Sequence, residues 1–437
     1  MTQPQTTNRW SVVIGAILIQ FCLGSIYAWG VFAAKLKTLP APANWTNAQT
    51  QMVFSLELII FALVMLYAGK LLTKVHPRLL VLASGTLVGL GYVIAGVLGG
   101  KDLMTVTLAI GIITGTGLGL GYVVPIAVCI RWFPDMKGLI TGLAVAGFGL
   151  GAICWGKMAG TWGNMLATYD IGGTFLIYGV VFIVVVALGS LLMKFPPEGW
   201  VPEGYVPPVA TAGVASSSGA ADFTIPEMLG TAQFFLIFIV FTVSSAAGLA
   251  CIGLIISYSN QELTQAFSAT ITDIAAAKSA AKAAAEMAML VVFPVCNSLG
   301  RIGWGTASDK LGRKTSILLM IAIQGAVILT FPMIVANPLL LAVYAGIIGF
   351  NFGGNFALFP TMTADTFGTK RVGQNYPVVF LAYGVGGVAG PLLAGYAGDL
   401  KQFPLAFTIG GIALLISAVL IFLVKPATKP VAVEAAA

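Results

Sequence analysis

The chain has 437 residues, of which 58% are hydrophobic and 8% are charged, and its net charge is +7. A soluble domain carries about 25% charged residues, so this chain has too few charges to cover a soluble protein of its size. The composition therefore indicates an integral membrane protein, and it excludes a soluble enzyme, a nucleic-acid-binding domain and a disordered chain.

Mainly apolar runs of about 20 residues follow one another along the chain, and each is long enough to cross a membrane as a helix. The first run is too long for the apolar region of a signal peptide, so we read it as a membrane span. The pattern predicts an all-α membrane protein with 12 transmembrane helices, at about residues 11–34, 51–72, 79–99, 104–130, 138–160, 171–193, 232–258, 286–306, 315–335, 338–360, 377–398 and 405–424.

The segment between the sixth and seventh spans is polar. It is rich in proline between Pro196 and Pro208 and continues into a serine run that ends at Gly219. This composition is typical of a flexible linker. It predicts an N-terminal six-helix half at 1–193, a cytoplasmic linker at 194–230 and a C-terminal six-helix half at 231–437. Transporters with two such halves place the substrate site between them, near the middle of the membrane.

Lys and Arg residues predict the orientation of the chain. With the N-terminus inside, about twice as many of them fall in cytoplasmic segments as in external segments. We therefore expect a multi-pass protein of the inner or plasma membrane with both termini in the cytoplasm.

The external segment before span eight is rich in alanine between residues 275 and 286, which favours helix. We expect span eight to extend outward there, either as a lid over the external opening or as a solvated extension. The five cysteines lie in apolar stretches, and the chain has one histidine. This pattern predicts inert, unpaired thiols, and neither a metal site nor a cofactor.

Two ionisable residues fall inside the predicted spans, where a charge is costly. Arg301 in span eight offers five donors that match a carboxylate, and Asn297, one turn earlier, can orient the guanidinium or touch the ligand. The alternative is a pair between Arg301 and Glu57 or backbone carbonyls. Glu57 in span two is a candidate for proton coupling; the alternative is a solvated carboxylate near the membrane surface.

Aromatic and amide side chains lie on the spans that line the cavity in a two-half transporter. Tyrosine hydroxyls can bond a carboxylate while their rings exclude water. Asn351 and Asn355 form a polar stripe on span ten. The candidate substrate-binding set is Arg301, Asn297, Tyr27, Tyr122, Phe148, Phe352, Asn355, Phe356 and Tyr383.

Several segments resemble known transporters. Gly305–Lys314 has the pattern G-x-x-x-D-K-x-G-R-K, which resembles the signature loop of the major facilitator superfamily. The R-W-F-P-D-x-K-G run at Arg131–Gly138 and the segment Asn297–Arg301 resemble the oxalate/formate antiporter family, near the monocarboxylate porters. The resemblance implies the twelve-helix fold, a signature loop that latches the two halves, and a monomer. It also implies that Arg301 holds a substrate carboxylate among Tyr27, Tyr122, Phe148, Phe352 and Phe356.

The same family has a lysine in span eleven, where this chain has Tyr383. One fixed cation in place of two favours a monocarboxylate such as lactate, pyruvate, acetate or formate. We expect a secondary transporter of small organic anions that works by alternating access in the lipid bilayer, with a proton as the coupling ion. Anion exchange is the first alternative, and a membrane carboxylate sensor that does not transport is another. The chain offers no nucleophile–base pair, so an enzyme is not expected.

Overall fold

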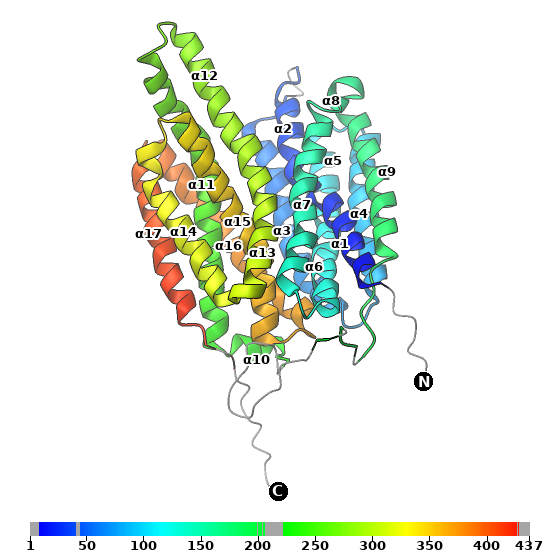
Figure 1. Ribbon diagram of the computed structural model, residues 1–437. Helices are drawn as coiled ribbons and strands as arrows, with labels where there is room; N and C mark the ends of the chain where they lie inside the picture. The colour runs from blue at the N-terminus through cyan, green and yellow to red at the C-terminus, as the bar shows by residue number, and fades with distance from the viewer. Residues whose placement is uncertain are drawn as a thin grey trace.

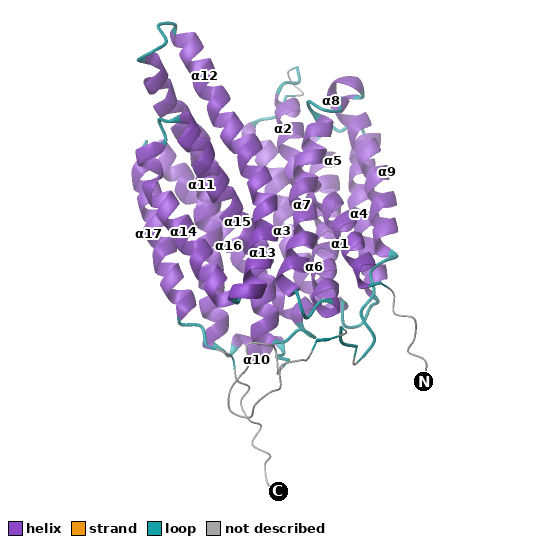
Figure 2. Ribbon diagram, in the orientation of Figure 1, coloured by secondary structure: helices purple, strands orange, loops and turns teal. Residues whose placement is uncertain are grey.

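The computed structural model describes residues 8–40, 44–198, 200–202, 204–205, 222–425 and 427, and within them the chain is helical with no strand (Figure 2). The elements in chain order are α1 (Arg9–Leu23), the 3₁₀ segment η1 (Gly24–Ala28), α2 (Trp29–Lys37), α3 (Asn47–Leu71), α4 (Pro77–Val97), α5 (Leu103–Val106), the π segment η2 (Thr107–Thr114), α6 (Gly115–Trp132), α7 (Lys137–Ala159), α8 (Met165–Thr168), α9 (Asp170–Ser190), α10 (Ile225–Leu229), α11 (Ala232–Ser268), α12 (Ile274–Glu286), the π segment η3 (Met287–Val292), α13 (Phe293–Leu311), α14 (Arg313–Ile334), α15 (Pro338–Phe367), α16 (Val372–Asp399) and α17 (Phe403–Phe422).

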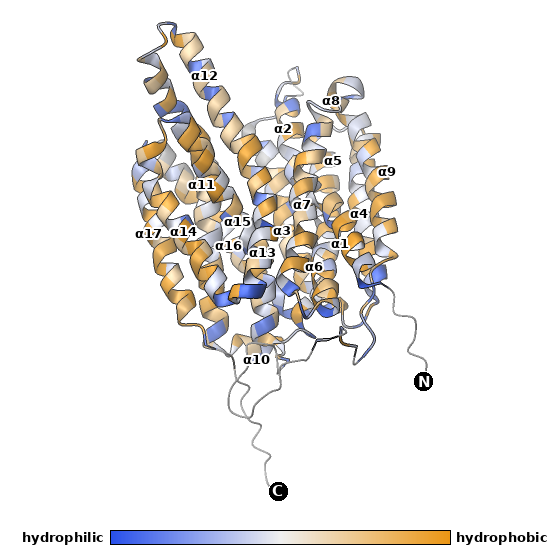
Figure 3. Ribbon diagram, viewed as in Figure 1, coloured by the Kyte–Doolittle hydropathy of each residue, from blue (hydrophilic) through white to orange (hydrophobic). Residues whose placement is uncertain are grey.

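Twelve helical stretches in the described residues are long and apolar enough to cross a membrane, from Arg9–Lys37 to Phe403–Phe422. This confirms the spans predicted from the sequence. Apolar residues line the spans, and hydrophilic residues gather near their ends and on α12 (Figure 3). On α9, Val180, Val184 and Leu188 are exposed at successive turns, which is the pattern of a helix face in contact with lipid.

Short polar residues begin several spans, and glycines end two of them. Thr46 and Gln49 form a reciprocal capping box at the start of α3, and Asn337 accepts hydrogen bonds from the first backbone N–H groups of α15. Gly312 and Gly368 have φ angles of 82° and 97° after α13 and α15. Only glycine adopts such angles without strain, so the chain turns sharply at both points.

The helices form two bundles side by side (Figure 1). We call α1–α9 the N-terminal bundle and α11–α17 the C-terminal bundle. The start of α1 and the end of α17 lie at one end of the molecule, the terminal face, and α11 and α12 protrude from the opposite hairpin face. Residues 206–221 of the predicted linker lie outside the described residues, and its C-terminal end contains α10 at the terminal face.

Ionic contacts join the two bundles at the terminal face. Asp309, at the end of α13, accepts hydrogen bonds from the backbone N–H groups of Gly138 and Leu139 at the start of α7, both at 2.8 Å. Arg313 binds the carboxylates of Asp309 at 2.7 Å and Asp365 at 2.9 Å. The signature segment, the decapeptide Gly305–Lys314, therefore contacts the opposite bundle in the way its resemblance implied.

The corresponding segment of the N-terminal bundle, Gly69–Arg78 between α3 and α4, is a first copy of this decapeptide and makes a different contact. Gly69 of α3 packs directly against the backbone of Gly373 on α16. The cations Lys70, Lys74 and Arg78 form no salt bridge with any described residue. The two copies thus share a close helix approach, and the charged contact belongs to the second copy.

Exposed residues run from the Tyr27–Tyr383 contact toward the hairpin face. Tyr27 remains 38% exposed although its hydroxyl bonds Tyr383 of the opposite bundle at 2.9 Å. Gly30 and Ala34 continue an exposed stripe from Tyr27 along α2, and open space surrounds Gly30 and Gly384. The bundles are therefore in contact at the terminal face and at the Tyr27–Tyr383 pair, and the stripe on α2 beyond Tyr27 is exposed.

The alanine-rich segment forms a helix, as expected. Ala277, Ala281 and Ala285 of α12 are buried at four-residue spacing, and Leu263 of α11 is buried beside them. The two helices form an upright hairpin (Figure 1). The hairpin protrudes beyond the other helices and does not bend across the neighbouring bundle (Figure 1). This arrangement favours a solvated extension and not a lid.

All five cysteines are free thiols. Cys22, Cys129 and Cys251 are buried, and Cys154 and Cys296 are partly exposed. Two of the thiols are therefore more accessible than the sequence predicted.

Candidate functional site

Arg301 lies on the face of α13 that meets the N-terminal bundle, and its side chain is buried. Its Nε donates to Asn297 Oδ1 at 3.2 Å, and its Nη1 donates to the backbone carbonyl of Val145 on α7 at 2.7 Å. No described carboxylate forms a salt bridge with the guanidinium. The positive charge is therefore held by neutral dipoles and is uncompensated.

Two aromatic rings, one from each bundle, face the guanidinium. The Arg301 Cζ atom lies 4.5 Å from the ring centroid of Phe356 on α15 and 5.9 Å from that of Phe148 on α7. A cation over an aromatic face gains about 0.5–2 kcal/mol, more where water is absent. The rings therefore fix the plane of the guanidinium.

Glycines of α7 bring the two bundles close enough for these contacts. A Cβ atom on Gly142 would collide with the backbone of Arg301, and one on Gly149 would lie 2.5 Å from Ser298 Oγ and 3.6 Å from Arg301 Nε. The helices can approach closely because these positions lack side chains.

Four tyrosine side chains lie in the surroundings of Arg301. Tyr27 and Tyr383 join their hydroxyls across the two bundles at 2.9 Å. Tyr122 packs edge-on against Phe148, with ring centroids 5.3 Å apart. The hydroxyl of Tyr376 is buried and has no hydrogen-bond partner. The structure thus places hydroxyl groups from both bundles around one guanidinium.

Two residues of the predicted set lie apart from the guanidinium. Asn355 faces α11 and accepts a hydrogen bond from Ser244 at 2.9 Å. Phe352 packs between Phe293 and Phe356, against Gly248 of α11. The amide oxygen of Asn355 therefore takes part in packing within the C-terminal bundle. Its place in the substrate site stays a prediction.

Glu57 is not at the membrane surface. It lies on α3 with 1% of its surface exposed, and neither carboxyl oxygen has a hydrogen-bond partner. The partners of Arg301 are Asn297 and Val145, so a pair between Arg301 and Glu57 is also excluded. The solvated interpretation of Glu57 is wrong because α3 packs this face against η2 and α6, where Gly115 touches its backbone.

Sequence reasoning missed three features of the site. Phe380 packs against Tyr122 with ring centroids 5.5 Å apart, and Tyr376 lies one turn earlier on α16. Both are aromatic residues on span eleven, so the rule that selected Tyr383 could have found them. The Val145 carbonyl has no sequence signal, because its role depends on how α7 faces Arg301.

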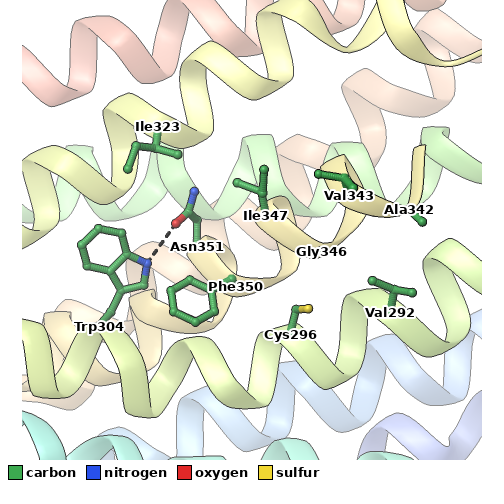
Figure 4. A pocket seen from close by; sticks show the side chains of 10 residues that line it. All are labelled: Val292, Cys296, Trp304, Ile323, Ala342, Val343, Gly346, Ile347, Phe350 and Asn351. Carbon is green, nitrogen blue, oxygen red and sulfur yellow. Dashed lines mark hydrogen bonds between the residues drawn. The ribbon is translucent and has the colours of Figure 1, made fainter. Parts of the chain in front are cut away.

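A separate groove of about 640 Å³ lies between α13, α14 and α15 (Figure 4). Its walls are apolar apart from Asn351, whose Oδ1 accepts a hydrogen bond from Trp304 Nε1 at 2.9 Å. Asn351 therefore belongs to this groove, and the polar stripe predicted for span ten serves packing within the C-terminal bundle.

The chain is similar to several transporters in sequence. A sequence profile described as Major Facilitator Superfamily matches residues 239–437. An uncharacterized MFS-type transporter, YhjX, from Escherichia coli is 29% identical and covers 87% of this chain and 86% of its own. The oxalate:formate antiporter of Oxalobacter formigenes is 26% identical over 98% of this chain and 95% of its own. Apicoplast pyruvate carrier 1 of Toxoplasma gondii is 25% identical over 87% and 82%.

The fold is also similar to a solved structure. The transporter FucP in the outward conformation superposes with a TM-score of 0.62 at 14% identity, covering 95% of this chain and 100% of that chain. The fold, the sequence relatives and the matched profile agree. The matched profile covers the C-terminal part of the chain, and the sequence relatives and the fold are those of transporters of the major facilitator superfamily.

Proposed function

We propose that this protein is a secondary transporter of small organic anions, and that its substrates are monocarboxylates of the lactate, pyruvate, acetate and formate class. The observation that carries the proposal is Arg301, a buried guanidinium between the two bundles that has no acidic partner among the described residues. A planar guanidinium binds a carboxylate through two parallel hydrogen bonds. The relatives named for oxalate, formate and pyruvate support an anion of this kind.

The charge of the site favours a single carboxylate group. Arg301 supplies one positive charge between the rings of Phe148 and Phe356. Span eleven supplies the neutral Tyr383 at the position where the related family has a lysine. A monoanion would neutralise the guanidinium, whereas a dianion would leave one negative charge uncompensated in an apolar site. Tyr27, Tyr122 and Tyr383 supply hydroxyl groups for the remaining oxygen atoms.

The carboxylate would bind next to an existing contact. Val145 O accepts one N–H group of Arg301 Nη1, and this bond joins the two bundles. A carboxylate paired with the guanidinium would weaken this bond, so substrate binding would loosen the bundles at the level where alternating access requires them to move.

Proton symport is the form of coupling that we favour. Glu57 is a buried acid that can hold a proton, and one proton with one monocarboxylate carries no net charge. Exchange of two anions is the second candidate, because the relative that covers 98% of this chain is named an antiporter. We place the terminal face in the cytoplasm, as the distribution of Lys and Arg predicts.

Arg301→Gln tests the binding site. The variant keeps a similar shape but loses the charge and the paired donors. Hydrogen bonds to charged groups contribute about 1.5–3 kcal/mol, so loss of this interaction should lower uptake of labelled lactate or pyruvate by about ten- to hundred-fold. The measurement is uptake into proteoliposomes at equal protein content, with the melting temperature of the purified variant as a check on folding.

Arg371→Gln is the matched control, because Arg371 is an exposed cation at the terminal face. It should transport at the wild-type rate. Wild-type uptake by a correctly folded Arg301→Gln protein would refute the site, and competition by oxalate in preference to lactate would refute the monocarboxylate class.

A further inference from the structure

A buried polar cluster lies inside the N-terminal bundle and plays no part in the Arg301 site. Its members are Glu57 on α3, Ser25 on η1 and Tyr92 on α4, and all three side chains are buried. The Tyr92 hydroxyl interacts with the Ser25 hydroxyl and with the Glu57 carboxyl. Neither Glu57 oxygen nor Ser25 Oγ makes a hydrogen bond of normal geometry.

Apolar and neutral groups surround the cluster on the elements packed against it. Gly111 and Gly115 of η2 and α6 lie against α3, and Gly115 touches the Glu57 backbone. Behind Tyr92, the rings of Phe175, Tyr178 and Phe182 on α9 close the bundle. No charged group among the described residues interacts with Glu57.

These surroundings determine the state of the Glu57 carboxyl group. A charged carboxylate needs hydrogen-bond donors or a cation when it is removed from water. Neither is bonded to Glu57 among the described residues, so this conformation favours a neutral carboxyl group that holds a proton. Release of that proton requires a second conformation in which water or a hydroxyl donor reaches the carboxylate.

One short segment connects this cluster to the opening between the bundles. η1 is a 3₁₀ segment of five residues in the middle of the first span, which is otherwise α-helical. A 3₁₀ stretch within a helix often marks a functional hinge. Ser25 of η1 is directed at Tyr92, whereas Tyr27, two residues later, bonds Tyr383 of the opposite bundle.

The packing of η1 depends on the same helix that holds Arg301. A Cβ atom on Gly24 would collide with the backbone carbonyl of Phe148 on α7. Three residues before Phe148, the Val145 carbonyl accepts the hydrogen bond from Arg301. A shift of α7 or of the Tyr27–Tyr383 pair would therefore displace η1, and with it Ser25.

We propose that Glu57, Ser25 and Tyr92 form a proton-binding site inside the N-terminal bundle, and that η1 couples this site to the carboxylate site at Arg301. The proposal rests on the proposed carrier function and adds a location for the coupled proton. When the bundles rearrange, displacement of Ser25 and Tyr92 exposes the carboxyl group, and Glu57 releases its proton to water as a carboxylate. Rebinding of one proton restores the neutral form.

Glu57→Gln tests this site, because glutamine has nearly the same shape and cannot lose a proton. Two assays on the same proteoliposomes separate the steps. Accumulation of labelled lactate driven by a pH gradient requires proton movement, whereas exchange of labelled for unlabelled lactate does not. We expect Glu57→Gln to lose accumulation by at least about tenfold and to exchange at close to the wild-type rate.

Ser25→Ala and Glu286→Gln complete the set. In Ser25→Ala, the pH at which accumulation is half-maximal should differ from the wild-type value, and the exchange rate should not change. If Ser25 only filled space, that pH would be the same in both proteins. Glu286 is a carboxylate on the exposed hairpin, with 45% of its side chain accessible. Glu286→Gln should behave as wild type in both assays.

The outcomes distinguish this proposal from the carrier function. Wild-type protein that exchanges lactate but does not accumulate it on a pH gradient would overturn the proton site and leave the carrier proposal standing. Wild-type accumulation by the Glu57→Gln variant would also overturn the proton site. Accumulation driven by a sodium gradient in the absence of a pH gradient would overturn it as well. Wild-type protein that neither exchanges nor accumulates any C1 to C4 carboxylate would overturn the carrier proposal itself.

Discussion

At the scale of single residues, the position of Arg301 is decided by groups that carry no charge. Its guanidinium is held by an amide, a backbone carbonyl and two aromatic rings. Gly149 makes this possible, because the missing side chain lets Ser298 and Arg301 approach α7. These neutral groups hold the guanidinium in place but do not neutralise its charge. An incoming carboxylate is therefore attracted by most of that positive charge.

Gly149→Ala should slow transport without unfolding the protein. The new Cβ would lie 2.5 Å from Ser298 Oγ, so the two helices or the serine must move. Overpacking of this kind costs about 1–3 kcal/mol and should reduce the exchange rate by roughly five- to hundred-fold. Exchange of labelled lactate in proteoliposomes measures the effect.

The double variant Gly149→Ala with Ser298→Ala provides the control. It removes the oxygen that the new Cβ meets and should recover most of the wild-type rate. A double variant as slow as the single one would show that Gly149 acts through something other than this steric contact.

At the scale of elements, some features were predictable and others depended on packing. Hydropathy predicts the twelve spans, because a membrane helix needs one long apolar run. The orientation of each span about its own axis is set by its neighbours. The amide oxygens of Asn351 and Asn355 accept hydrogen bonds from Trp304 and Ser244 within one bundle, and the sequence did not indicate these partners.

Interruptions of the spans were also hidden from sequence reasoning. η1, η2 and η3 replace α-helical hydrogen bonding in spans one, four and eight. Their residues are ordinary apolar, small and hydroxyl-bearing side chains, so no composition signal marks them. The buried position of Glu57 follows from how η2 and α6 pack on α3, and for this reason the sequence left its environment open.

The contact between α7 and α13 yields a prediction at this scale. Asp309 caps the N-terminus of α7 and binds Arg313, so its charge stabilises the closed terminal face. Asp309→Asn should lose about 0.5–2 kcal/mol of this stabilisation, the usual value of a helix cap. The measurement is the distance between spin labels attached at positions 74 and 310, which are exposed on opposite bundles. A larger fraction of Asp309→Asn molecules than of wild-type molecules should have the labels far apart.

Asp135→Asn is the matched control for that experiment. Asp135 pairs with Arg9 at 2.8 Å, and both residues belong to the N-terminal bundle. This variant should leave the distance distribution unchanged. An equal shift in both variants would show that the labels report a general loss of order at the terminal face.

At the scale of the whole molecule, the closed terminal face and the opening toward the hairpin face define one state of a transport cycle. The exposed stripe from Tyr27 through Gly30 to Ala34 faces the opening, since the Tyr27 hydroxyl reaches the opposite bundle. A carrier that alternates must cover this stripe when the terminal face opens, and the substrate shifts the balance between the two states.

A cysteine at Ala34 in a cysteine-free background measures this shift. A membrane-impermeant maleimide added outside intact cells should modify Ala34→Cys rapidly, because we place the hairpin face outside. Saturating lactate should slow the modification several-fold, since turnover populates the state in which the stripe is covered. Lys278→Cys on the exposed hairpin should react at one rate with and without lactate. If both positions were modified only from the cytoplasmic side, the proposed orientation would be reversed. If lactate did not change the modification rate of Ala34→Cys, the exposed stripe would not take part in the transport cycle.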